Sequence, residues 1–473
     1  MVASSEPGTR VARHCGQRAA PGRRCGEWPL ARSWLGLGLA VAVVWSLSLA
    51  FAQPPAAATT DAPTGGDEAV LCPAPTPPEL PRPDAPLAVP EDVRIGLFTA
   101  VWQAVDQFYL FDDFGGTDWD DVAQAYAPMV LETENAWEFY DLLDRMVGTL
   151  GDPLTTFANP LVVEAIAEQD ASYGGIGALL DRAAVEREGE ALRVVAVFPG
   201  SPAEAAGLLP RDRILEVDSD RCPRTEIIRG PEGSEVRLLV ASPGAEPREL
   251  VIERATLTAS ILPEARRVGP GEAYAYLRLV SLAGEETLRA IEAAMEAFAM
   301  PGEGGAPLAG IVLDVRGTRG GAPGVMLALL SYFLEGEIGA FYGRTGQSVL
   351  DLPPAPLKVG FDQVPLAVLV DDASVAEAEQ LAALLQANGR ASVVGQATRG
   401  VTYGVRSLDF VGGSRLQLTV LGLRLPDGEA LERVGVTPDV LVEQDWAEYR
   451  EEDDPYLLAA FARLADVRRE RSE

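Results

Sequence analysis

Short apolar runs alternate with segments of helical periodicity over the C-terminal half of the chain. Leu366–Val370 is such a run, a helix is predicted from Ser374 to Asn388, and a second run follows at Ala391–Val394. Strand, helix and strand within about 30 residues form the βαβ unit of a parallel sheet. Similar runs at Tyr274–Leu279 and Gly310–Arg316 extend that sheet. We therefore predict an α/β fold whose chemistry lies beyond the carboxyl ends of the strands.

Residues 91–160 carry helical rather than strand periodicity. Apolar side chains recur at helical spacing in the first segment, at Leu97, Val101, Val105 and Phe108. Thr117 with Asp120 resembles a capping box for a second helix, and Asn135 is predicted to cap a third. This stretch is interpreted as an N-terminal helical region, and Pro455–Arg469 as a helix on the surface.

Residues 1–52 have the composition of a targeting segment. Arginines precede the uncharged stretch Trp34–Phe51, and Ala50-Phe51-Ala52 fits a small-x-small cleavage site before Gln53. The apolar stretch approaches the roughly 18–20 residues of a membrane span, so an uncleaved anchor is the alternative to a signal peptide. Residues 53–90 are rich in Pro, Ala and Thr and are predicted to be an extended linker. Both alternatives place the remaining chain outside the cytoplasm, whether periplasmic, secreted or at the cell surface.

The charge balance restricts the partners. Asp and Glu number 70 against 39 Lys and Arg, which gives a net charge of −31. Repulsion from phosphate groups argues against nucleic acid and anionic lipid as partners. Cys72 and Cys222 follow the targeting segment. In an exported protein they are candidates for a disulfide, with two unpaired thiols as the alternative.

Few side chains are available for acid–base chemistry. The only histidine, His14, lies in the targeting segment, which excludes a Ser-His arrangement in the mature protein. The only lysine, Lys358, precedes the strand Leu366–Val370, and the guanidinium of Arg399 does not lose its proton. Acids gather near the predicted helix start, at Asp371, Asp372, Glu377 and Glu379. A metal site or carboxylate base is one interpretation, but the helix dipole accounts for them, so neither metal nor cofactor is predicted.

Two motifs flank the helix that follows Leu366–Val370. Val370–Glu379 follows the pattern V-N-x-x-S-A-S-A-S-E, and Gly395–Thr402 follows G-x-x-T-x-G-K-G. These stretches resemble the core of the carboxyl-terminal processing peptidases, also called tail-specific proteases, which are serine peptidases. The resemblance implies that the nucleophile position holds Ala376 and the general-base lysine position holds Val401. A glutamine usual four residues after the lysine is Val405.

Further stretches match the same family. Gly317–Gly321 follows a predicted strand and resembles D-L-R-x-N-x-G-G, which implies that Gly320 and Gly321 are oxyanion-like glycines. A tight strand-to-helix turn explains these glycines equally well. Asp152–Thr155 resembles D-P-H-T with Leu154 in place of histidine. Ser374, two residues before the nucleophile position, is predicted to be a helix N-cap.

Residues 172–258 resemble a PDZ domain. The carrying motifs are Gly174–Gly177, Gly200–Leu208, which matches G-S-P-A-x-x-A-G-L, and Ile228–Ser234, which matches I-R-G-x-x-G-T. The resemblance implies that backbone N–H groups of Gly175, Ile176 and Gly177 hold a peptide C-terminus while a following strand pairs with the peptide. A packing module without a ligand is the alternative.

The predicted architecture is a multidomain α/β protein. Its parts are a signal peptide or anchor at 1–52, a linker at 53–90, a helical region at 91–160, the PDZ-like domain at 172–258, a tail-specific protease core at 259–445 and a C-terminal helix at 446–473. The predicted function is non-catalytic binding of polypeptide C-termini or unfolded segments. The alternatives are a serine peptidase with a relocated nucleophile and a scaffolding subunit. The oligomeric state stays open.

Overall fold

The computed structural model describes residues 89–164, 174–181, 191–256, 262–301, 307–355 and 358–471. The predicted targeting segment, most of the linker and Cys72 lie outside these residues. Over the described ranges, no helix combines the length and apolarity that a membrane crossing requires.

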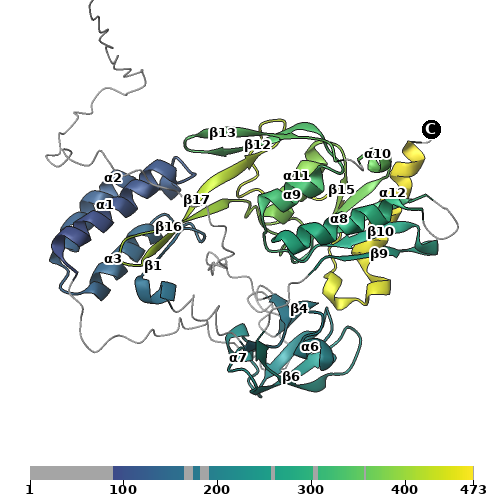
Figure 1. The fold of residues 1–473 in the computed structure, drawn as a ribbon, viewed down its shortest axis with the longest axis horizontal. Coiled ribbons are helices and arrows are strands. Elements are labelled where there is room, and N and C mark those ends of the chain that lie inside the picture. Colours follow the sequence, from purple (N-terminus) through teal and green to yellow (C-terminus); the bar gives the residue numbers. More distant parts are fainter. Residues whose placement is uncertain are drawn as a thin grey trace, which may run out of the picture. The chain divides into compact units, whose positions relative to one another are not determined.

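A six-stranded sheet forms the centre of the protease-like core (Figure 1). The strand order is β18-β15-β14-β11-β10-β9. Pairing is parallel from β18 through to β10, and only β9 runs antiparallel. The predicted βαβ unit is confirmed. The strands are β9 (Glu264–Val268), β10 (Tyr274–Arg278), β11 (Gly310–Asp314), β14 (Leu366–Val370), β15 (Ser392–Gly395) and β18 (Val440–Leu441).

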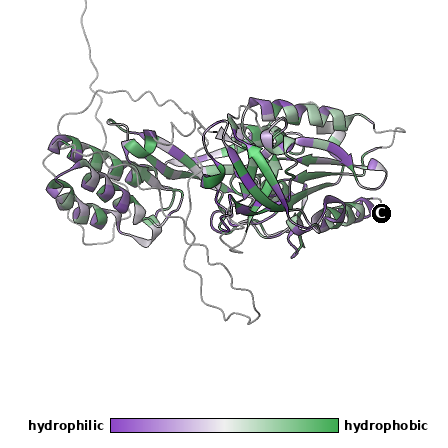
Figure 2. Ribbon diagram, turned by 90° about the horizontal axis from the view of Figure 1, so that it is seen from below, coloured by the Kyte–Doolittle hydropathy of each residue, from purple (hydrophilic) through white to green (hydrophobic). Residues whose placement is uncertain are grey.

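Helices cover both faces of this sheet, which explains why its strands are apolar throughout. Ile311 and Leu313 of β11 point to the core beneath one set of helices, whereas Val312 points to the core on the other side. Figure 2 shows the hydrophobic strands between helices of mixed polarity. The first face carries α8 (Glu285–Ala299), α9 (Pro323–Leu330) and α11 (Glu377–Ala387), and the second carries α12 (Pro455–Glu470). The prediction of α12 as a surface helix is therefore incomplete, because Tyr456 and Leu464 are buried against the sheet.

A second sheet joins the core to the helical region. Leu416 and Leu418 of its long strand β17 belong to the same buried cluster as the three N-terminal helices. Asn135 caps the third helix as predicted, but the second is capped by Asp118 rather than Thr117. The helices are α1 (Glu91–Phe108), α2 (Trp119–Glu132) and α3 (Ala136–Gly148). The strands are β1 (Thr156–Ala158), β12 (Gly336–Gly343), β13 (Gly346–Leu352), β16 (Gly404–Asp409) and β17 (Arg415–Arg424); a short helix, α10 (Lys358–Phe361), precedes β14.

The PDZ-like domain is a five-stranded antiparallel sheet in the order β3-β4-β5-β6-β7, with a two-stranded pair β2-β8. Its core holds Ile176, Leu192 and Val236, and two short helices lie beside it. Cys222 of this domain is disulfide-bonded, and the other three cysteines of the chain lie outside the described residues. The elements are β2 (Gly174–Gly175), β3 (Ala178–Asp181), β4 (Leu192–Val197), α6 (Pro202–Ala205), β5 (Arg213–Val217), α7 (Thr225–Ile228), β6 (Glu235–Ala241), β7 (Arg248–Glu253) and β8 (Ala255–Thr256).

Candidate functional site

The turn after β14 is held by a buried hydroxyl–carboxylate pair. Ser374 Oγ lies 2.8 Å from both the Val315 carbonyl oxygen and Asp371 Oδ1, and Ser374 is fully buried. Asp371 also accepts hydrogen bonds from Gly317 N–H at 2.9 Å and from Trp446 Nε1 at 3.0 Å. These bonds fix the turn against the neighbouring strand. Ser374 thus staples the turn and is not the predicted helix cap, because α11 begins only at Glu377.

Ala376, at the predicted nucleophile position, has a backbone conformation that favours glycine. Its φ is 54° and its ψ is −122°, and it is the residue directly before α11. An L-residue in this region carries about 1–3 kcal/mol of strain. A sharp strand-to-helix turn of this kind presents a side chain above a sheet, as nucleophile-bearing turns do. The methyl group of Ala376 therefore occupies the position from which a serine hydroxyl would act as the nucleophile in such a turn.

Val401, at the predicted base position, lies beside Ala376. Its carbonyl oxygen accepts a hydrogen bond from Ala376 N–H at 2.8 Å. The loop carrying Val401 is fastened to α11 from both sides, since Gln380 Nε2 donates to the Thr402 carbonyl at 2.7 Å and Gly400 N–H donates to Glu379 Oε1 at 2.6 Å. The structure thus joins the two halves of the sequence motif. Neither Ala376 nor Val401 offers a proton or a lone pair for acid–base chemistry.

Glu379 is the buried carboxylate that organises this loop. It is fully buried, and burial raises the pKa of its carboxyl group although neighbouring hydrogen bonds lower it. Gly400 next to it has a φ of +74°, and a Cβ there would lie 2.6 Å from Val434 N. Only glycine fits this position. The helix dipole explains an acid near the start of α11, but the charge pattern of the sequence does not indicate that Glu379 binds the loop at Gly400.

The glycine-rich turn after β11 also lies beside Ala376. A Cβ on Gly321 would lie 2.4 Å from Leu282 Cβ, so this backbone passes too close for any side chain. Gly320 N–H donates to the Val375 carbonyl at 3.3 Å, whereas Gly321 N–H faces the Glu377 carboxylate. Of the two predicted oxyanion-like glycines, Gly321 is therefore the one whose N–H is directed toward the site.

The two remaining family-like positions lie in the second sheet. Val405 is in β16 and pairs with Thr419 of β17. Thr155 of the D-P-L-T stretch donates to Asp152 Oδ2 at 2.6 Å, and its hydroxyl accepts from Thr419 N–H at 3.1 Å. Both positions are thereby tied to β17, and Leu154 supplies no titratable group next to them.

A group of buried charges surrounds Trp446, and we call it the Trp446 cluster. It consists of Arg211, Arg278, Arg316, Asp314 and Asp454 around the indole ring. Arg316 is fully buried and bonds Asp314 at 2.6 Å and Asp454 at 2.9 Å. Burial alone would raise the pKa of Asp314, but Arg316 and Arg278 outweigh it and hold that pKa well below its usual range. Sequence patterns gave no indication of this cluster, since its members are far apart in the chain.

The glycine loop of the PDZ-like domain has a mixed environment. The Ile176 side chain is buried in the domain core, and the Ile176 carbonyl accepts from Ala203 N–H at 2.7 Å. Gly177 has a φ of 82°, and its carbonyl accepts from Phe198 N–H at 2.8 Å. Because its side chain is buried, Ile176 is available to a ligand only through its backbone. Its side chain stabilises the domain.

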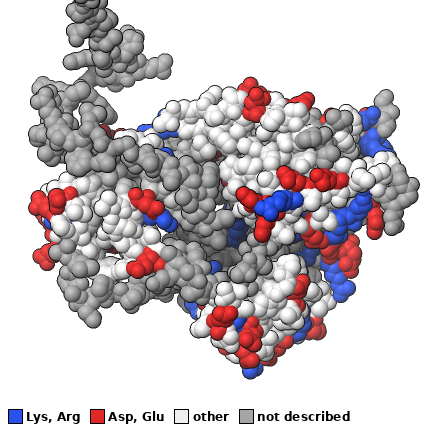
Figure 3. Space-filling model, in the orientation of Figure 1, with Lys and Arg blue, Asp and Glu red and all other residues white. Residues whose placement is uncertain are grey.

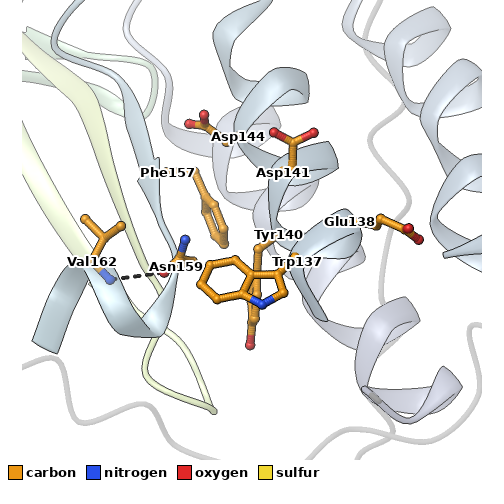
Figure 4. Close-up of a pocket in the computed structure, with 8 residues that line it drawn as sticks. All are labelled: Trp137, Glu138, Tyr140, Asp141, Asp144, Phe157, Asn159 and Val162. Atoms are coloured by element: carbon orange, nitrogen blue, oxygen red, sulfur yellow. Dashed lines mark hydrogen bonds between the residues drawn. The ribbon is translucent and has the colours of Figure 1, made fainter. Parts of the chain in front are cut away.

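A cavity of about 380 Å³ lies in the helical region, away from the predicted site (Figure 4). Figure 4 shows Asp141 and Asp144 on one side of it and Trp137 on another, and the Asn159 side chain accepts from Val162 N–H at 3.0 Å. Burial, together with Asp141, raises the pKa of Asp144. On the face shown in Figure 3, acidic side chains are interspersed with basic ones.

Three family models match the chain. The model of peptidase family S41 matches residues 273–442, the Tricorn protease C1 domain matches residues 90–148, and the PDZ domain matches residues 193–254. The matched ranges coincide with the sheet core, the N-terminal helices and the small β domain described above. The expected fold and the presence of a PDZ domain are confirmed.

The relatives agree with these models. A carboxyl-terminal-processing protease of Synechocystis is 28% identical over 369 residues, which span 75% of this chain and 82% of the relative. A carboxy-terminal processing protease, CtpA, of Bacillus subtilis is 28% identical and covers 66% of this chain and 65% of its own. The structure of a photosystem II D1 C-terminal processing protease has a TM-score of 0.56 at 25% identity, covering 79% of this chain and 98% of its own. The chain is therefore similar to the carboxyl-terminal processing peptidases, with residues 273–442 matching peptidase family S41 and residues 193–254 matching a PDZ domain.

Proposed function

We propose that this protein is a non-catalytic member of its family that works outside the cytoplasm and binds polypeptide C-termini through its PDZ domain. The observation that carries the proposal is the meeting of Ala376 and Val401. Ala376 N–H donates a hydrogen bond to the Val401 carbonyl at 2.8 Å, in a turn of the kind that presents a nucleophile. Residue 376 carries a methyl group and residue 401 an isopropyl group, where a hydroxyl and an amine would be required.

A relocated nucleophile finds little support around this turn. Ser374 is fully buried, and its hydroxyl already lies within hydrogen-bond distance of Asp371 and Val315. The only lysine, Lys358, belongs to α10, ahead of β14, and no histidine follows His14. A serine without a neighbouring base is an unactivated alcohol. We therefore assign Ser374 a structural role.

Two features of the PDZ domain support peptide binding. Among the described residues, β3 is at the edge of its sheet and pairs only with β4, so a peptide strand has a free edge to pair with. Gly175 ends β2 and Gly177 lies in the turn between β2 and β3, and neither carries a side chain that would hinder a peptide terminus from reaching the backbone. The ligand class is a polypeptide with a free terminal carboxylate.

Work outside the cytoplasm fits the chemistry of Cys222. This residue is disulfide-bonded, and disulfides persist mainly in oxidising compartments. The basic segment followed by Trp34–Phe51 supplies the corresponding targeting signal. Fractionation with N-terminal sequencing tests this part. A start at Gln53 or an intact chain in the membrane is expected, and recovery from the cytosol contradicts it.

Catalysis is tested with the full chain, an unfolded protein substrate and a fluorophosphonate probe for active serines. We expect neither cleavage nor labelling, because removal of the nucleophile from a serine peptidase lowers kcat about a millionfold. If cleavage occurs and disappears in Ser374→Ala, the protein is an active peptidase with a relocated nucleophile.

Peptide binding is tested by titrating matched free-acid and C-terminally amidated peptides against the full chain. Binding of the free acid is expected on the order of micromolar, and the amide should bind much more weakly because the loop donors lose a charged acceptor. Gly177→Ala, at a φ of 82°, should weaken binding, whereas Gly244→Ala, at a φ of 68° in the same domain, is the matched control. Equal affinity for acid and amide, or none for either, would identify the domain as a scaffolding module.

A further inference from the structure

The Glu377 carboxylate lies between Ala376 and the glycine-rich turn. A Cβ built on Gly320 would be 3.3 Å from Glu377 Oε2 and 3.5 Å from Ala376 Cβ. The carboxylate and the Ala376 methyl group therefore converge on the same glycine. Glu377 is half-buried there, although it is the first residue of α11 and solvent is available to most side chains at a helix start.

Two backbone N–H groups are directed at this carboxylate. One is the N–H of Glu377 itself, which has no partner inside the helix because it belongs to the first turn. The other is the N–H of Gly321. Burial raises the pKa of the Glu377 carboxyl group, and these two N–H groups lower it. The Glu377 carboxylate thus occupies the corner beside Gly320 that these two N–H groups share.

The position of these two N–H groups relative to Ala376 indicates what they would do in a peptidase with a serine at residue 376. One N–H comes from Glu377, which follows the nucleophile position, and the other comes from Gly321, which follows the Gly320 that lies beside Ala376. A pair of N–H groups beside a nucleophile is the arrangement that stabilises the oxyanion of acyl transfer. A substrate carbonyl attacked at residue 376 would place its oxygen where the Glu377 carboxylate lies.

We propose that Glu377 fills the oxyanion hole of the former peptidase site with its own carboxylate. The inference rests on the proposed function, because it takes Ala376 and Val401 as the dyad positions. It adds that the oxyanion hole is occupied by the Glu377 carboxylate, in addition to the loss of the serine and lysine side chains. A peptide carbonyl can enter only if the Glu377 side chain leaves, so the loss of Ser and Lys is not the only barrier to catalysis.

The test compares two reconstructed enzymes made in the full chain, Ala376→Ser/Val401→Lys and the same pair with Glu377→Ala. In the labelling step, Ser Oγ attacks the phosphorus of a fluorophosphonate, fluoride leaves, and the serine proton passes to the lysine amine. The phosphoryl oxygen requires the hole during attack. We expect the triple variant to be labelled on the order of a hundredfold faster than the double variant, the usual effect of an oxyanion site. Equal rates would overturn the inference.

Hydrogen exchange keeps the inference testable if neither reconstruction reacts. In the otherwise unchanged protein, the Gly321 amide should exchange several-fold more slowly than in Glu377→Ala, because a carboxylate covers it. Glu285→Ala, which removes an exposed acid at the start of α8, is the matched control and should leave this amide unchanged. Unchanged exchange in Glu377→Ala contradicts the inference. Labelling of the unmodified protein would instead contradict the proposed function and leave the role of Glu377 to the exchange measurement.

Discussion

Two regions at the carboxyl ends of the same strands show opposite uses of charge. At the corner of Ala376 and Val401, the side chains expected to do chemistry are alkyl groups. At the ends of β10 and β11 in the same sheet, the Trp446 cluster packs three guanidinium groups and two carboxylates around one indole ring. Arg278 ends β10 and Asp314 ends β11, so both regions occupy the edge where parallel sheets carry active sites.

The comparison separates position from chemistry. A dense group of ionisable residues at this edge is usually a reason to suspect catalysis. Here every member of the Trp446 cluster is paired, and the network links Arg211 of the PDZ domain to Asp454 before α12 at 2.7 Å. The cluster therefore stabilises the assembly of segments, while the corner carries alkyl groups at the two predicted catalytic positions, residues 376 and 401.

The largest effect is expected from removing one charge of the cluster. Asp314→Ala leaves the buried guanidinium of Arg278 without its carboxylate and that of Arg316 with Asp454 alone, and Tyr276 loses a hydrogen bond of 2.7 Å. Breaking one side of a buried pair costs about 3–5 kcal/mol in unfolding free energy. Urea denaturation of the full chain measures it.

The matched control is an exposed ion pair. Glu285→Ala removes the partner of Arg289, at a site where both side chains are mostly in solvent. Its cost should stay below about 1 kcal/mol. If Asp314→Ala is as mild as Glu285→Ala, the cluster is not a structural unit and the comparison between the two regions fails.

The sequence was most informative where the signal is local. The apolar run Leu366–Val370 forms β14 with the predicted bounds, and a backbone hydrogen bond joins the two motif positions Ala376 and Val401. The prediction from local propensity was wrong at Ser374. A serine four residues after a strand is typical of a helix N-cap, but here its buried hydroxyl bonds to Asp371 and Val315 instead.

What the sequence could not give depends on contacts between distant segments. The Trp446 cluster joins residues from 211 to 454, and no periodicity or spacing connects them. Glu377 had a weak signal, since the family pattern has alanine at its position, but its direction toward Gly321 depends on how the turn after β11 folds. Ile176 was placed correctly in its loop, yet which way its side chain points is decided by packing.

The two regions should respond to acid with opposite sign. The pKa of Asp314 is lowered in the folded protein by Arg316 and Arg278, so its stabilisation is present above the unfolded value of roughly 4 and is lost as pH falls toward the folded value. The pKa of Glu379 is raised by burial, so the folded state gains stability as pH falls through its folded value. Unfolding free energies of Asp314→Asn and Glu379→Gln, measured against the unmodified protein from pH 7 to pH 3, test both signs.

For Asp314→Asn, the difference from the unmodified protein should shrink below about pH 4. For Glu379→Gln, the unmodified protein should gain on the variant as pH falls from 7 toward about 4. If the two stability differences change in the same direction as pH falls, the buried carboxylates of the corner and of the cluster do not differ in how pH affects them.

The smallest effect concerns the strain at Ala376. Its φ of 54° and ψ of −122° suit glycine, so Ala376→Gly should relieve about 1–3 kcal/mol of strain and lose roughly 0.5–1 kcal/mol to backbone entropy. A net gain of about 1 kcal/mol in unfolding free energy is expected. Ala383→Gly, in the buried interior of α11, is the control and should cost about 1 kcal/mol.

The sign of that difference decides how the corner is interpreted. Strain at a nucleophile position is explained in an active enzyme because it presents the reacting atom. In this chain the residue at the strained position carries only a methyl group, so under the proposed function we expect Ala376→Gly to relieve the strain without loss of function. If Ala376→Gly destabilises the protein as Ala383→Gly does, the turn is held by contacts of the Ala376 methyl group with its surroundings. The corner would then be a packed structural element like the Trp446 cluster, and the contrast between the two regions would narrow to polarity alone.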